Sequence, residues 1–306
     1  METQDGQARE PQAEGRRNGR SAPATDWTVW QDAEVVAKFA GDRRSGILGG
    51  VEQLEVLCQL LPALPTGGAT ARVLDLGCGD GILLETVLQR WPDAQGVALD
   101  GSVLMLKRAA ERLAAFGAAV SYVLADFNAP QWVEKLPYLS FDAIVSGFAI
   151  HHSEDDRKRA LYAQLFDLLR PGGVFINVEH VASASPLGAA LFERAYALNL
   201  ARSRRAQGQE ATFEEVLDEI VNRLDKSANR LTPVETQLEW LRAIGYTDVD
   251  CYWKYYELAV LAGYKPKNQF QQDEQDKTGL NRISKTNPIP VSVSTTHTSP
   301  VSLSLS

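Results

Sequence analysis

The amino-acid sequence predicts an α/β fold in which helices cover both faces of a doubly wound, mostly parallel sheet that ends in an antiparallel hairpin. Between residues 72 and 178, short apolar runs rich in β-branched residues alternate with segments of helical periodicity. Strands that alternate with helices of this length are typical of a parallel sheet. After Ala182 consecutive helical patterns replace the alternation, and two more strand-like runs follow them.

Apolar spacing and turn residues predict the individual elements. A first helix is expected at 51–61, where leucines share one face. Pro171, followed by two glycines, indicates a helix end and the start of a strand. Thr232 and Pro233 indicate a helix N-terminus, and Gly245 indicates the end of that helix. The seven expected strands are 72–76, 95–99, 120–125, 141–145, 173–178, 246–252 and 256–262, and the helices among the first five are 81–90, 102–116, 131–135 and 154–169.

The chain is expected to form one folded domain between two tails. Residues 1–25 and 265–306 are polar and poor in large apolar side chains, so both tails are expected to be disordered. The folded domain is expected to cover 26–264. Within it, residues 186–231 carry two helical apolar stripes and are expected to be a helical lid inserted after the fifth strand.

Composition and charge exclude some classes of function. The chain has 306 residues, 44% of them hydrophobic, which is enough for one α/β core with a cap. There are 39 acidic and 31 basic residues, and the resulting net charge of −8 disfavours a nucleic-acid partner. Three scattered cysteines without a C-x-x-C spacing indicate reduced thiols and a cytoplasmic location. Neither a membrane span nor an export signal is expected, because the sequence lacks a sufficiently long apolar run.

A glycine-rich stretch, residues 73–81 (VLDLGCGDG), is the most informative motif. An apolar run, glycines at alternate positions and helical sequence from Ile82 together predict a strand, a tight loop and a helix. Glycine allows close approach of a ligand to the backbone and adopts positive φ at little cost. The loop amides and the helix N-terminus would favour an anionic or strongly polar group.

The glycine spacing differs from the dinucleotide fingerprint G-x-G-x-x-G, because the sixth position is Ile82 and the third glycine comes one place early. The pattern acid-x-G-x-G-x-G resembles the first motif of class I S-adenosylmethionine-dependent methyltransferases. This resemblance implies a Rossmann-like sheet of seven strands and S-adenosyl-L-methionine as the cofactor. It also implies that Asp75 orders the loop and the ammonium end of the cofactor, and that Gly77, Cys78 and Gly79 lie along its methionyl part.

Two further strand ends carry acidic residues. Asp100 follows the glycine loop at about the distance where nucleoside-binding sheets place an acid on the ribose hydroxyls, and Gly101 comes next as a further cofactor contact. Alternatively, Asp100 caps the helix that follows. The resemblance puts Asp126 near the exocyclic amine of adenine and Phe127 against the ring face. Because parallel strands end on one edge, these residues are expected to share a site.

Residues 141–152 (FDAIVSGFAIHH) resemble the fourth-strand motif of the same methyltransferases, which puts Ser146 near the cofactor sulfur. The N-P-P-aromatic signature of enzymes that methylate base or glutamine nitrogens is missing. His151 and His152 lie where methyl acceptors approach and are candidate general bases, although a packed or helix-capping pair is the alternative. His180, beside a glutamate, is a candidate second acid, base or orienting group. Adjacent histidines without H-x-x-x-H spacing disfavour a metal, and none is expected.

Arg44 is a candidate partner for the cofactor carboxylate, and a solvated arginine is an equally compatible interpretation. Residues 231–236 and 256–259 also resemble the carboxy-S-adenosylmethionine synthase family of tRNA wobble-uridine modification. That family has an aromatic residue near Gly50 and a basic pair near 224–226, and this sequence has neither. Its carboxylate-bearing cofactor is therefore not expected.

The sequence thus predicts a methyltransferase that acts on a small-molecule substrate. A carboxy-S-adenosylmethionine synthase-like enzyme and a non-catalytic S-adenosylmethionine-binding protein remain as alternatives. A nicotinamide oxidoreductase is disfavoured by Ile82. The identity of the acceptor and the methylated atom stay open, and a homodimer is compatible with the sequence.

Overall fold

A computed structural model describes residues 27–41, 46–62 and 70–267. Arg44 lies outside these residues, as do the predicted N-terminal tail and nearly all of the predicted C-terminal tail. None of the described helices is long and apolar enough to span a membrane.

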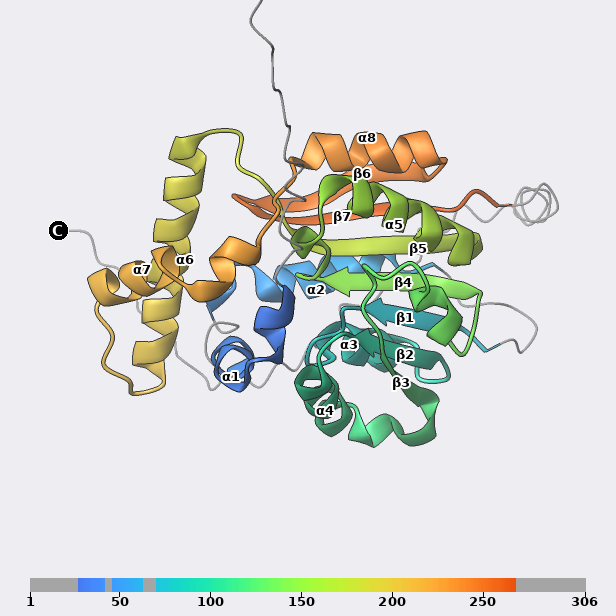
Figure 1. Cartoon of the computed structure of the whole chain (residues 1–306), viewed down its shortest axis with the longest axis horizontal. Helices are drawn as coiled ribbons and strands as arrows, with labels where there is room; N and C mark the ends of the chain where they lie inside the picture. Colours follow the sequence, from blue (N-terminus) through green and yellow to red (C-terminus); the bar gives the residue numbers. More distant parts are fainter. Residues whose placement is uncertain (1–26, 42–45, 63–69, 268–306) are drawn as a thin grey trace, which may run out of the picture.

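One seven-stranded sheet forms the centre of the molecule (Figure 1). Its strand order is β3-β2-β1-β4-β5-β7-β6, so the order reverses between β1 and β4. The first five strands pair in parallel, and β7 pairs antiparallel with both β5 and β6. The predicted fold class is therefore confirmed. The strands are β1 (Arg72–Leu76), β2 (Gln95–Asp100), β3 (Val120–Leu124), β4 (Phe141–Gly147), β5 (Leu169–His180), β6 (Thr247–Tyr255) and β7 (Leu258–Tyr264).

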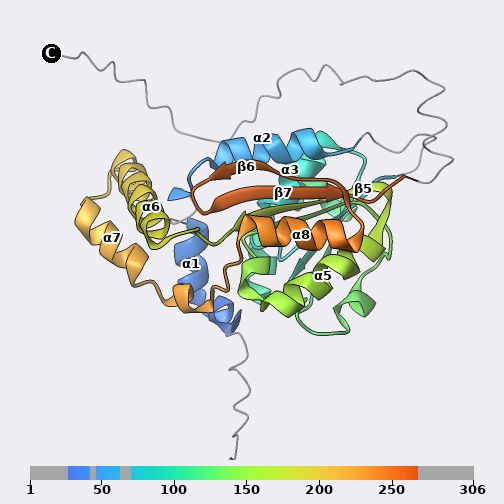
Figure 2. The same ribbon diagram turned by 90° about the horizontal axis from the view of Figure 1, so that it is seen from above.

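Helices cover both faces of the sheet, as Figure 2 shows from above. One core contains the buried faces of α2 (Gly50–Leu60), α3 (Ile82–Arg90) and α4 (Val103–Arg112). The other contains those of α5 (Asp155–Leu168) and α8 (Val234–Ile244), together with short helices η4 (Trp132–Lys135) and η5 (Ile150–His152). Strand residues alternate between the cores: Val73 belongs to the first and Leu74 to the second. This alternation is the period-two pattern of a sheet that is buried on both sides.

Three predicted boundaries are wrong. Strand β5 begins at Leu169, directly after α5, so Pro171 lies inside the strand; the β4–β5 register shift nearby accommodates it. The helix predicted for 102–116 ends at Arg112 and continues as the 3-10 segment η3 (Ala114–Ala119), where Gly117 has φ 51°. Thr232 does not cap α8, because Pro233 occupies the N-cap position and the Thr232 hydroxyl donates to Asp155.

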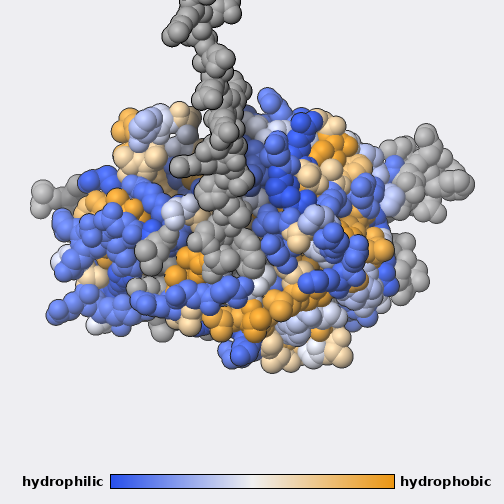
Figure 3. Space-filling view, in the orientation of Figure 1, coloured by the Kyte–Doolittle hydropathy of each residue, from blue (hydrophilic) through white to orange (hydrophobic). Residues whose placement is uncertain are grey.

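The segment between β5 and α8 forms a helical unit beside the sheet (Figure 1). Buried Leu200, Val216 and Ile220 give it a small core of its own. Ser185 caps its first helix, and Thr212 forms a capping box with Glu215 at the start of the second. Hydrophilic side chains cover most of this unit on the face shown in Figure 3. Its helices are α6 (Pro186–Ala206), α7 (Phe213–Val221) and η6 (Leu224–Ala228).

The N-terminal segment η1 (Trp27–Gln31) and α1 (Ala33–Gly41) lies against the carboxyl end of β2. The Ser102 hydroxyl donates to the Trp30 carbonyl at 2.7 Å, and the Gln31 amide donates to the Gly101 carbonyl at 2.8 Å. These bonds place Trp30 at the edge of the sheet where the parallel strands end.

Candidate active site

The glycine loop between β1 and α3 approaches the other strand ends with its backbone exposed. Gly77 and Gly79 have φ of 66° and 54°, which a residue with a side chain rarely adopts. A Cβ atom on Gly77 would lie 2.4 Å from the Ala149 Cβ, whereas a Cβ on Gly79 would meet nothing within 4 Å. Asp75 holds the loop from below, because its carboxylate accepts from the Leu84 amide of α3 at 3.1 Å.

Asp100 links the end of β2 to the glycine loop. One carboxylate oxygen accepts from the Gly79 amide at 2.9 Å, and the other accepts from the Ser102 amide at 2.8 Å. Burial raises the pKa of Asp100, against the lowering effect of hydrogen bonds from Ser102, Gly79 and Gly101. Asp100 thus bonds to both the glycine loop and Ser102, the residue before the following helix. The cap of that helix is Ser102 itself, because its hydroxyl accepts from the Met105 amide.

The end of β3 provides a third group. Asp126 accepts from the Asn128 backbone and side-chain amides at 2.8 and 3.1 Å, which fixes the turn after the strand. Phe127 follows it and is largely buried, with 9% of its surface exposed.

These strand ends surround one cavity of about 640 Å³, which we call the cofactor cavity. It brings together six of the residues that the sequence proposed as cofactor contacts: Gly77, Gly79, Asp100, Gly101, Asp126 and Phe127. Its other lining residues come from the N-terminal segment, α4, the turn after β3, the end of β4 and the chain after β4; they are Trp30, Met105, Asn128, Gly147, Phe148, Ala149 and His152.

A second cavity of about 600 Å³ lies next to the first, and we call it the acceptor cavity. Trp30, Phe148 and His152 line both cavities and so form their common boundary. The sheet side of the acceptor cavity carries His151 and His180. The helical unit and neighbouring segments supply its other lining residues, which are Ile47, Phe192, Tyr196, Arg223, Asp225, Asn229 and Leu258.

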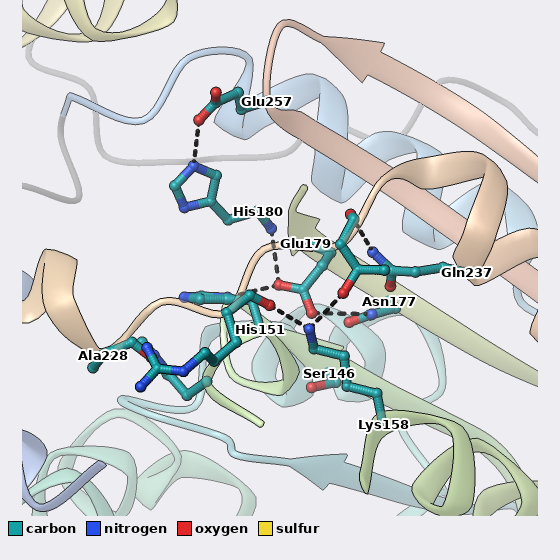
Figure 4. A network of polar contacts seen from close by, with 12 residues as sticks. Ser146, His151, Lys158, Asn177, Glu179, His180, Ala228, Gln237 and Glu257 are labelled. Atoms are coloured by element: carbon teal, nitrogen blue, oxygen red, sulfur yellow. Dashed lines mark hydrogen bonds and ion pairs between the residues drawn. The ribbon is translucent and has the colours of Figure 1, made fainter. Parts of the chain in front are cut away.

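His151 lines the acceptor cavity and forms a buried pair with Glu179. The imidazole Nδ1 lies 2.7 Å from the Glu179 carboxylate, and 6% of His151 and 1% of Glu179 are exposed. The same carboxylate accepts from the His180 amide at 2.8 Å and from the Asn177 side-chain amide at 3.2 Å. Figure 4 shows these donors converging on Glu179 from β5 while His151 approaches from η5.

A buried lysine lies near the His151–Glu179 pair. Lys158 of α5 is 1% exposed and donates to the Thr232 hydroxyl at 2.6 Å, to Asp155 at 2.9 Å and to the Arg230 carbonyl (Figure 4). Burial raises the pKa of Glu179, while the bonded amides and the positive charge of Lys158 lower it. Burial lowers the pKa of His151 well below its usual value, and nearby positive charges act in the same direction. His151 is therefore neutral at physiological pH.

Comparison with known proteins relates this arrangement of strand ends to methyltransferases. A family model described as a methyltransferase domain matches residues 73–173, which contain the glycine loop and all three strand ends. The chain carries a class I S-adenosylmethionine-dependent methyltransferase domain. An uncharacterized methyltransferase from Mycobacterium bovis is 38% identical over 112 residues, which cover 37% of this chain and 52% of that protein. The chain therefore spans about half the length of the first relatives it matches.

Two further matches extend beyond the methyltransferase domain core. A trans-aconitate 2-methyltransferase from Azoarcus sp. is 26% identical over 267 residues, which cover 78% of this chain and 92% of that protein. An O-methyltransferase family protein from Burkholderia thailandensis has a TM-score of 0.54 at 16% identity, covering 78% of this chain and 61% of that chain. At this identity the structural likeness establishes the fold alone.

His152 and His180 occupy different positions in the methyltransferase domain. Both ring nitrogens of His152 are engaged: Nε2 accepts from the Trp30 indole at 3.1 Å, and Nδ1 lies 3.3 Å from the Ala228 carbonyl. Burial lowers the pKa of His152 to about 3. His180 Nε2 lies 2.8 Å from the Glu257 carboxylate, in the turn between β6 and β7. Among the described residues, no group of three or more potential ligand side chains is arranged to hold a metal ion.

Three sequence candidates do not line either cavity. Asp75 is buried beneath the loop, where it can order the backbone without touching the ligand directly. Cys78 turns into the core below α3, and burial raises the pKa of its thiol well above the usual value. Ser146 is fully buried and donates to the Leu76 carbonyl at 2.8 Å, so its hydroxyl bridges β4 and β1.

The residues of the cofactor cavity fit S-adenosylmethionine. The open space in front of Gly79 leaves the loop amides accessible to the methionyl end. The Asp100 carboxylate retains lone pairs beyond its hydrogen bonds to backbone amides and can accept from a ribose diol. Asp126 and Phe127 together offer an acceptor and a ring face to an adenine.

Sequence reasoning missed several lining residues. Trp30 belongs to a segment about 50 residues before the glycine loop, and no local motif marks it as a ligand contact. Phe148 has φ 52°, a strained conformation for a residue with a side chain, and it stands between the two cavities. Glu257 lines neither cavity but bonds to the lining residue His180; the sequence does not indicate this contact, because the two residues are 77 positions apart.

Proposed function

We propose that this protein transfers a methyl group from S-adenosylmethionine to a hydroxyl group of a small-molecule acceptor bound in the acceptor cavity. The observation that carries the proposal is the common boundary of the two cavities at Trp30, Phe148 and His152, with the buried His151–Glu179 pair beside it. A nucleophile in the second cavity can therefore meet a methyl group presented from the first.

When bound, the cofactor supplies a methyl group on a positively charged sulfur. His151 is neutral and can accept at Nε2 the proton that the acceptor hydroxyl loses. Glu179 accepts the Nδ1 proton, which holds the imidazole in the tautomer that leaves Nε2 unprotonated. Lys158 compensates the buried negative charge of Glu179, and both oxygens of that carboxylate are held by amide donors. These groups keep the base in one orientation before the acceptor arrives.

The helical unit of residues 186–231 acts in this proposal as a cover for the acceptor. Phe192 and Tyr196 of α6 face the acceptor cavity, and η6 closes it near Asp225 and Asn229. Exclusion of water from the reacting groups strengthens the electrostatic interactions among them. The unit thereby completes a site that the sheet edge alone would leave open to solvent.

The charges of the cavities favour a hydroxyl over a carboxylate acceptor. The relatives named trans-aconitate 2-methyltransferase act, by that name, on a tricarboxylate. Arg223 is the one Lys or Arg side chain among the described residues that line the acceptor cavity, and Asp225 lies 3.4 Å from it. The acceptor cavity therefore has no excess positive charge to bind a polyanion. A carboxylate acceptor is already deprotonated, so its methylation would not need a base.

The alternatives from the sequence receive less support. Carboxy-S-adenosyl-L-methionine synthases are among the relatives of this chain. A carboxylated cofactor would need a basic side chain, yet the described residues that line the cofactor cavity include Asp100 and Asp126 and no Arg or Lys. A purely cofactor-binding protein would not require the His151–Glu179 pair. A cytoplasmic location, a small-molecule partner in place of nucleic acid, and a homodimer complete the proposal, with the acidic net charge and the scattered cysteines as support.

Thermal denaturation with S-adenosylmethionine, S-adenosylhomocysteine and NAD in parallel tests the proposal. At a hundred times the dissociation constant, a ligand of the folded state stabilises it by about 2.7 kcal/mol. We expect both S-adenosyl compounds to raise the midpoint by roughly 5 to 10 °C and NAD to leave it unchanged. An acceptor library with mass detection of methylated products follows. Stabilisation by NAD without stabilisation by either S-adenosyl compound would contradict the proposal, and so would a complete absence of methylated products.

A further inference from the structure

A second imidazole–carboxylate pair, which the methyl-transfer step does not use, lies at the acceptor cavity, where its imidazole is a lining residue. His180 Nε2 lies 2.8 Å from the Glu257 carboxylate, and both residues are buried, with 8% and 6% of their surfaces exposed. His180 ends β5, whereas Glu257 lies in the turn between β6 and β7. The antiparallel hairpin thus supplies a carboxylate that holds His180, and His180 lines the same cavity as His151.

Each carboxylate binds one nitrogen of its imidazole. The other nitrogen is the one that can bond to a ligand in the cavity. Burial raises the pKa of Glu257, but hydrogen bonds from His180 and Ser183 outweigh it and keep the pKa below its usual value. Glu257 is therefore ionised and can accept a proton from Nε2 of His180. In the neutral imidazole this tautomer has Nδ1 as its hydrogen-bond acceptor. The same reasoning leaves Nε2 of His151 as an acceptor.

The two unprotonated nitrogens point the same way. In Figure 4 the second nitrogens of His151 and His180 both point away from their carboxylates, toward the same side of the network. The ring centroids are 5.6 Å apart, and both rings line the acceptor cavity. A molecule that satisfies both nitrogens must therefore offer two hydrogen-bond donors a few ångströms apart.

The remaining lining residues indicate what kind of molecule carries these two hydrogen-bond donors. Phe192 stands against His180, with ring centroids 5.3 Å apart, and stacks on Tyr196 at an interplanar angle of 16°. Phe148 and Trp30 add aromatic surface at the boundary with the cofactor cavity. Aromatic side chains in such arrangements favour a flat ring. Arg223, the one basic side chain in this described lining, lies close to Asp225, so a neutral molecule fits better than an anion.

We propose that the acceptor is an uncharged aromatic compound with two hydroxyl groups, of which one is methylated beside His151 and the other is anchored by His180. This inference rests on the proposed methyl transfer. In the reaction the acceptor oxygen would form a bond to the methyl carbon as the bond from that carbon to sulfur breaks, with its electron pair returning to sulfur to give S-adenosylhomocysteine. The hydroxyl proton would pass to Nε2 of His151. The second hydroxyl keeps its proton and donates to Nδ1 of His180. His180 is thus a specificity-determining residue.

Calorimetry on the protein saturated with S-adenosylhomocysteine tests this inference without turnover. The probes are naphthalene-2,3-diol, naphthalene-1,3-diol, 2-naphthol and 3-hydroxy-2-naphthoate. We expect at least one diol to bind tenfold or more tightly than 2-naphthol, and the carboxylate to bind no more tightly than 2-naphthol. Equal affinities for 2-naphthol and both diols would overturn the inference. Tightest binding of the carboxylate, or binding of none of the four probes, would also overturn it.

Two substitutions assign the preference to the second pair. In His180→Phe the ring volume is kept and the acceptor nitrogen is lost, so we expect the diol to bind no better than 2-naphthol. Glu257→Gln removes the charge that fixes the tautomer and should reduce the diol preference at least threefold. Glu134→Gln makes the same chemical change at an exposed residue and should retain the full preference. Unaltered S-adenosylhomocysteine affinity shows that each variant is folded.

The outcomes separate this inference from the proposed function. A diol preference that survives both His180→Phe and Glu257→Gln would refute the role of the second pair. Failure of the protein to bind S-adenosylhomocysteine would refute the methyltransferase proposal itself. Binding of S-adenosylhomocysteine without a diol preference would leave the proposed function in place and remove only the acceptor class.

Discussion

The two cavities of the molecule are built in different ways. The cofactor cavity is formed largely by backbone and by residues that directly follow β1, β2 and β3, within one continuous stretch of the chain. The acceptor cavity is formed by side chains from η1, η5, β5, α6, η6 and β7, and from segments that connect such elements. One cavity thus depends on the order of strands in the sheet, and the other on contacts between segments that are distant in sequence.

This difference indicates which cavity can change while the fold persists. Strand ends of a parallel sheet meet at one edge in any doubly wound fold, so the cofactor cavity follows from the topology. The acceptor cavity takes its shape from α6 and η6, which pack around the separate core of Leu200, Val216 and Ile220. We therefore expect substitutions to affect cofactor binding and methyl transfer independently.

The largest expected effect is on catalysis alone. His151→Gln removes the proposed base, and a general base contributes about 10² to 10⁴ in rate, so kcat should fall by that factor. Glu179→Gln should lower kcat as well, because the amide cannot fix the imidazole tautomer. The measurements are kcat with the acceptor found by screening, S-adenosylhomocysteine affinity, and the ¹⁵N chemical shifts of His151.

Glu134→Gln is the control for the carboxylate change, since Glu134 is exposed on η4. In the wild type the ¹⁵N shifts should show a proton on Nδ1 of His151, and Glu179→Gln should yield a mixture of tautomers. A large loss of S-adenosylhomocysteine affinity in His151→Gln would contradict the separation of the two cavities.

The second-largest expected effect is a loss of S-adenosylmethionine affinity in the cofactor cavity. Asp100→Ala removes a carboxylate that the Gly79 amide and the proposed ribose contact share. Hydrogen bonds to charged groups contribute about 1.5 to 3 kcal/mol, so S-adenosylmethionine should bind roughly ten- to a hundredfold more weakly. Calorimetry measures the loss, and Asp93→Ala, at an exposed turn, should bind like the wild type. Unchanged affinity in Asp100→Ala would remove this residue from the cofactor site.

The sequence was sufficient for the fold and for the strand-end part of the cofactor cavity. Strand and helix periods, together with glycines at alternate positions, predicted the sheet and three of its ligand-facing strand ends. Cys78 and Ser146 show the limit of this reasoning. Both lie in the right motifs, but the direction of each side chain depends on neighbours: Cys78 packs into the core and Ser146 bonds to Leu76.

The acceptor cavity could be predicted only in part. The sequence singled out His151, His152 and His180, yet it could not distinguish a base from a packed histidine. That distinction depends on partners far along the chain. Nδ1 of His151 meets Glu179, 28 residues away, whereas Nε2 of His152 meets Trp30, 122 residues away. No local pattern encodes pairings of that kind.

A third effect connects the acceptor cavity to stability. Burial keeps His152 neutral with a pKa of about 3, whereas an unfolded histidine has a pKa near 6.5. The unfolded state therefore binds the extra proton between these values, so stability is complete above about pH 6.5 and falls as the pH decreases toward 3. The slope should be about 1.4 kcal/mol per pH unit for each such histidine.

Chemical denaturation at pH 7, 6 and 5 measures this slope. His152→Phe keeps a ring in the same place and should flatten the slope by about one proton. An identical slope in the variant would mean that His152 is not buried in its neutral form. Glu179, whose pKa is raised, acts with the opposite sign in both proteins, so the difference between their slopes isolates His152.

The smallest effect tests the boundary that the two cavities share. Trp30→Phe preserves an aromatic ring but removes the indole donor to Nε2 of His152, a bond of 3.1 Å. A partly buried neutral hydrogen bond contributes about 0.5 to 1.5 kcal/mol, so each ligand should lose roughly two- to tenfold in affinity. S-adenosylhomocysteine and the acceptor should be affected together, because Trp30 lines both cavities and is tied through its carbonyl to Ser102. Calorimetry on the two ligands separately decides the matter. A loss confined to one of them would show that the N-terminal segment belongs to a single cavity, and the independence of the two sites would then be greater than the shared lining indicates.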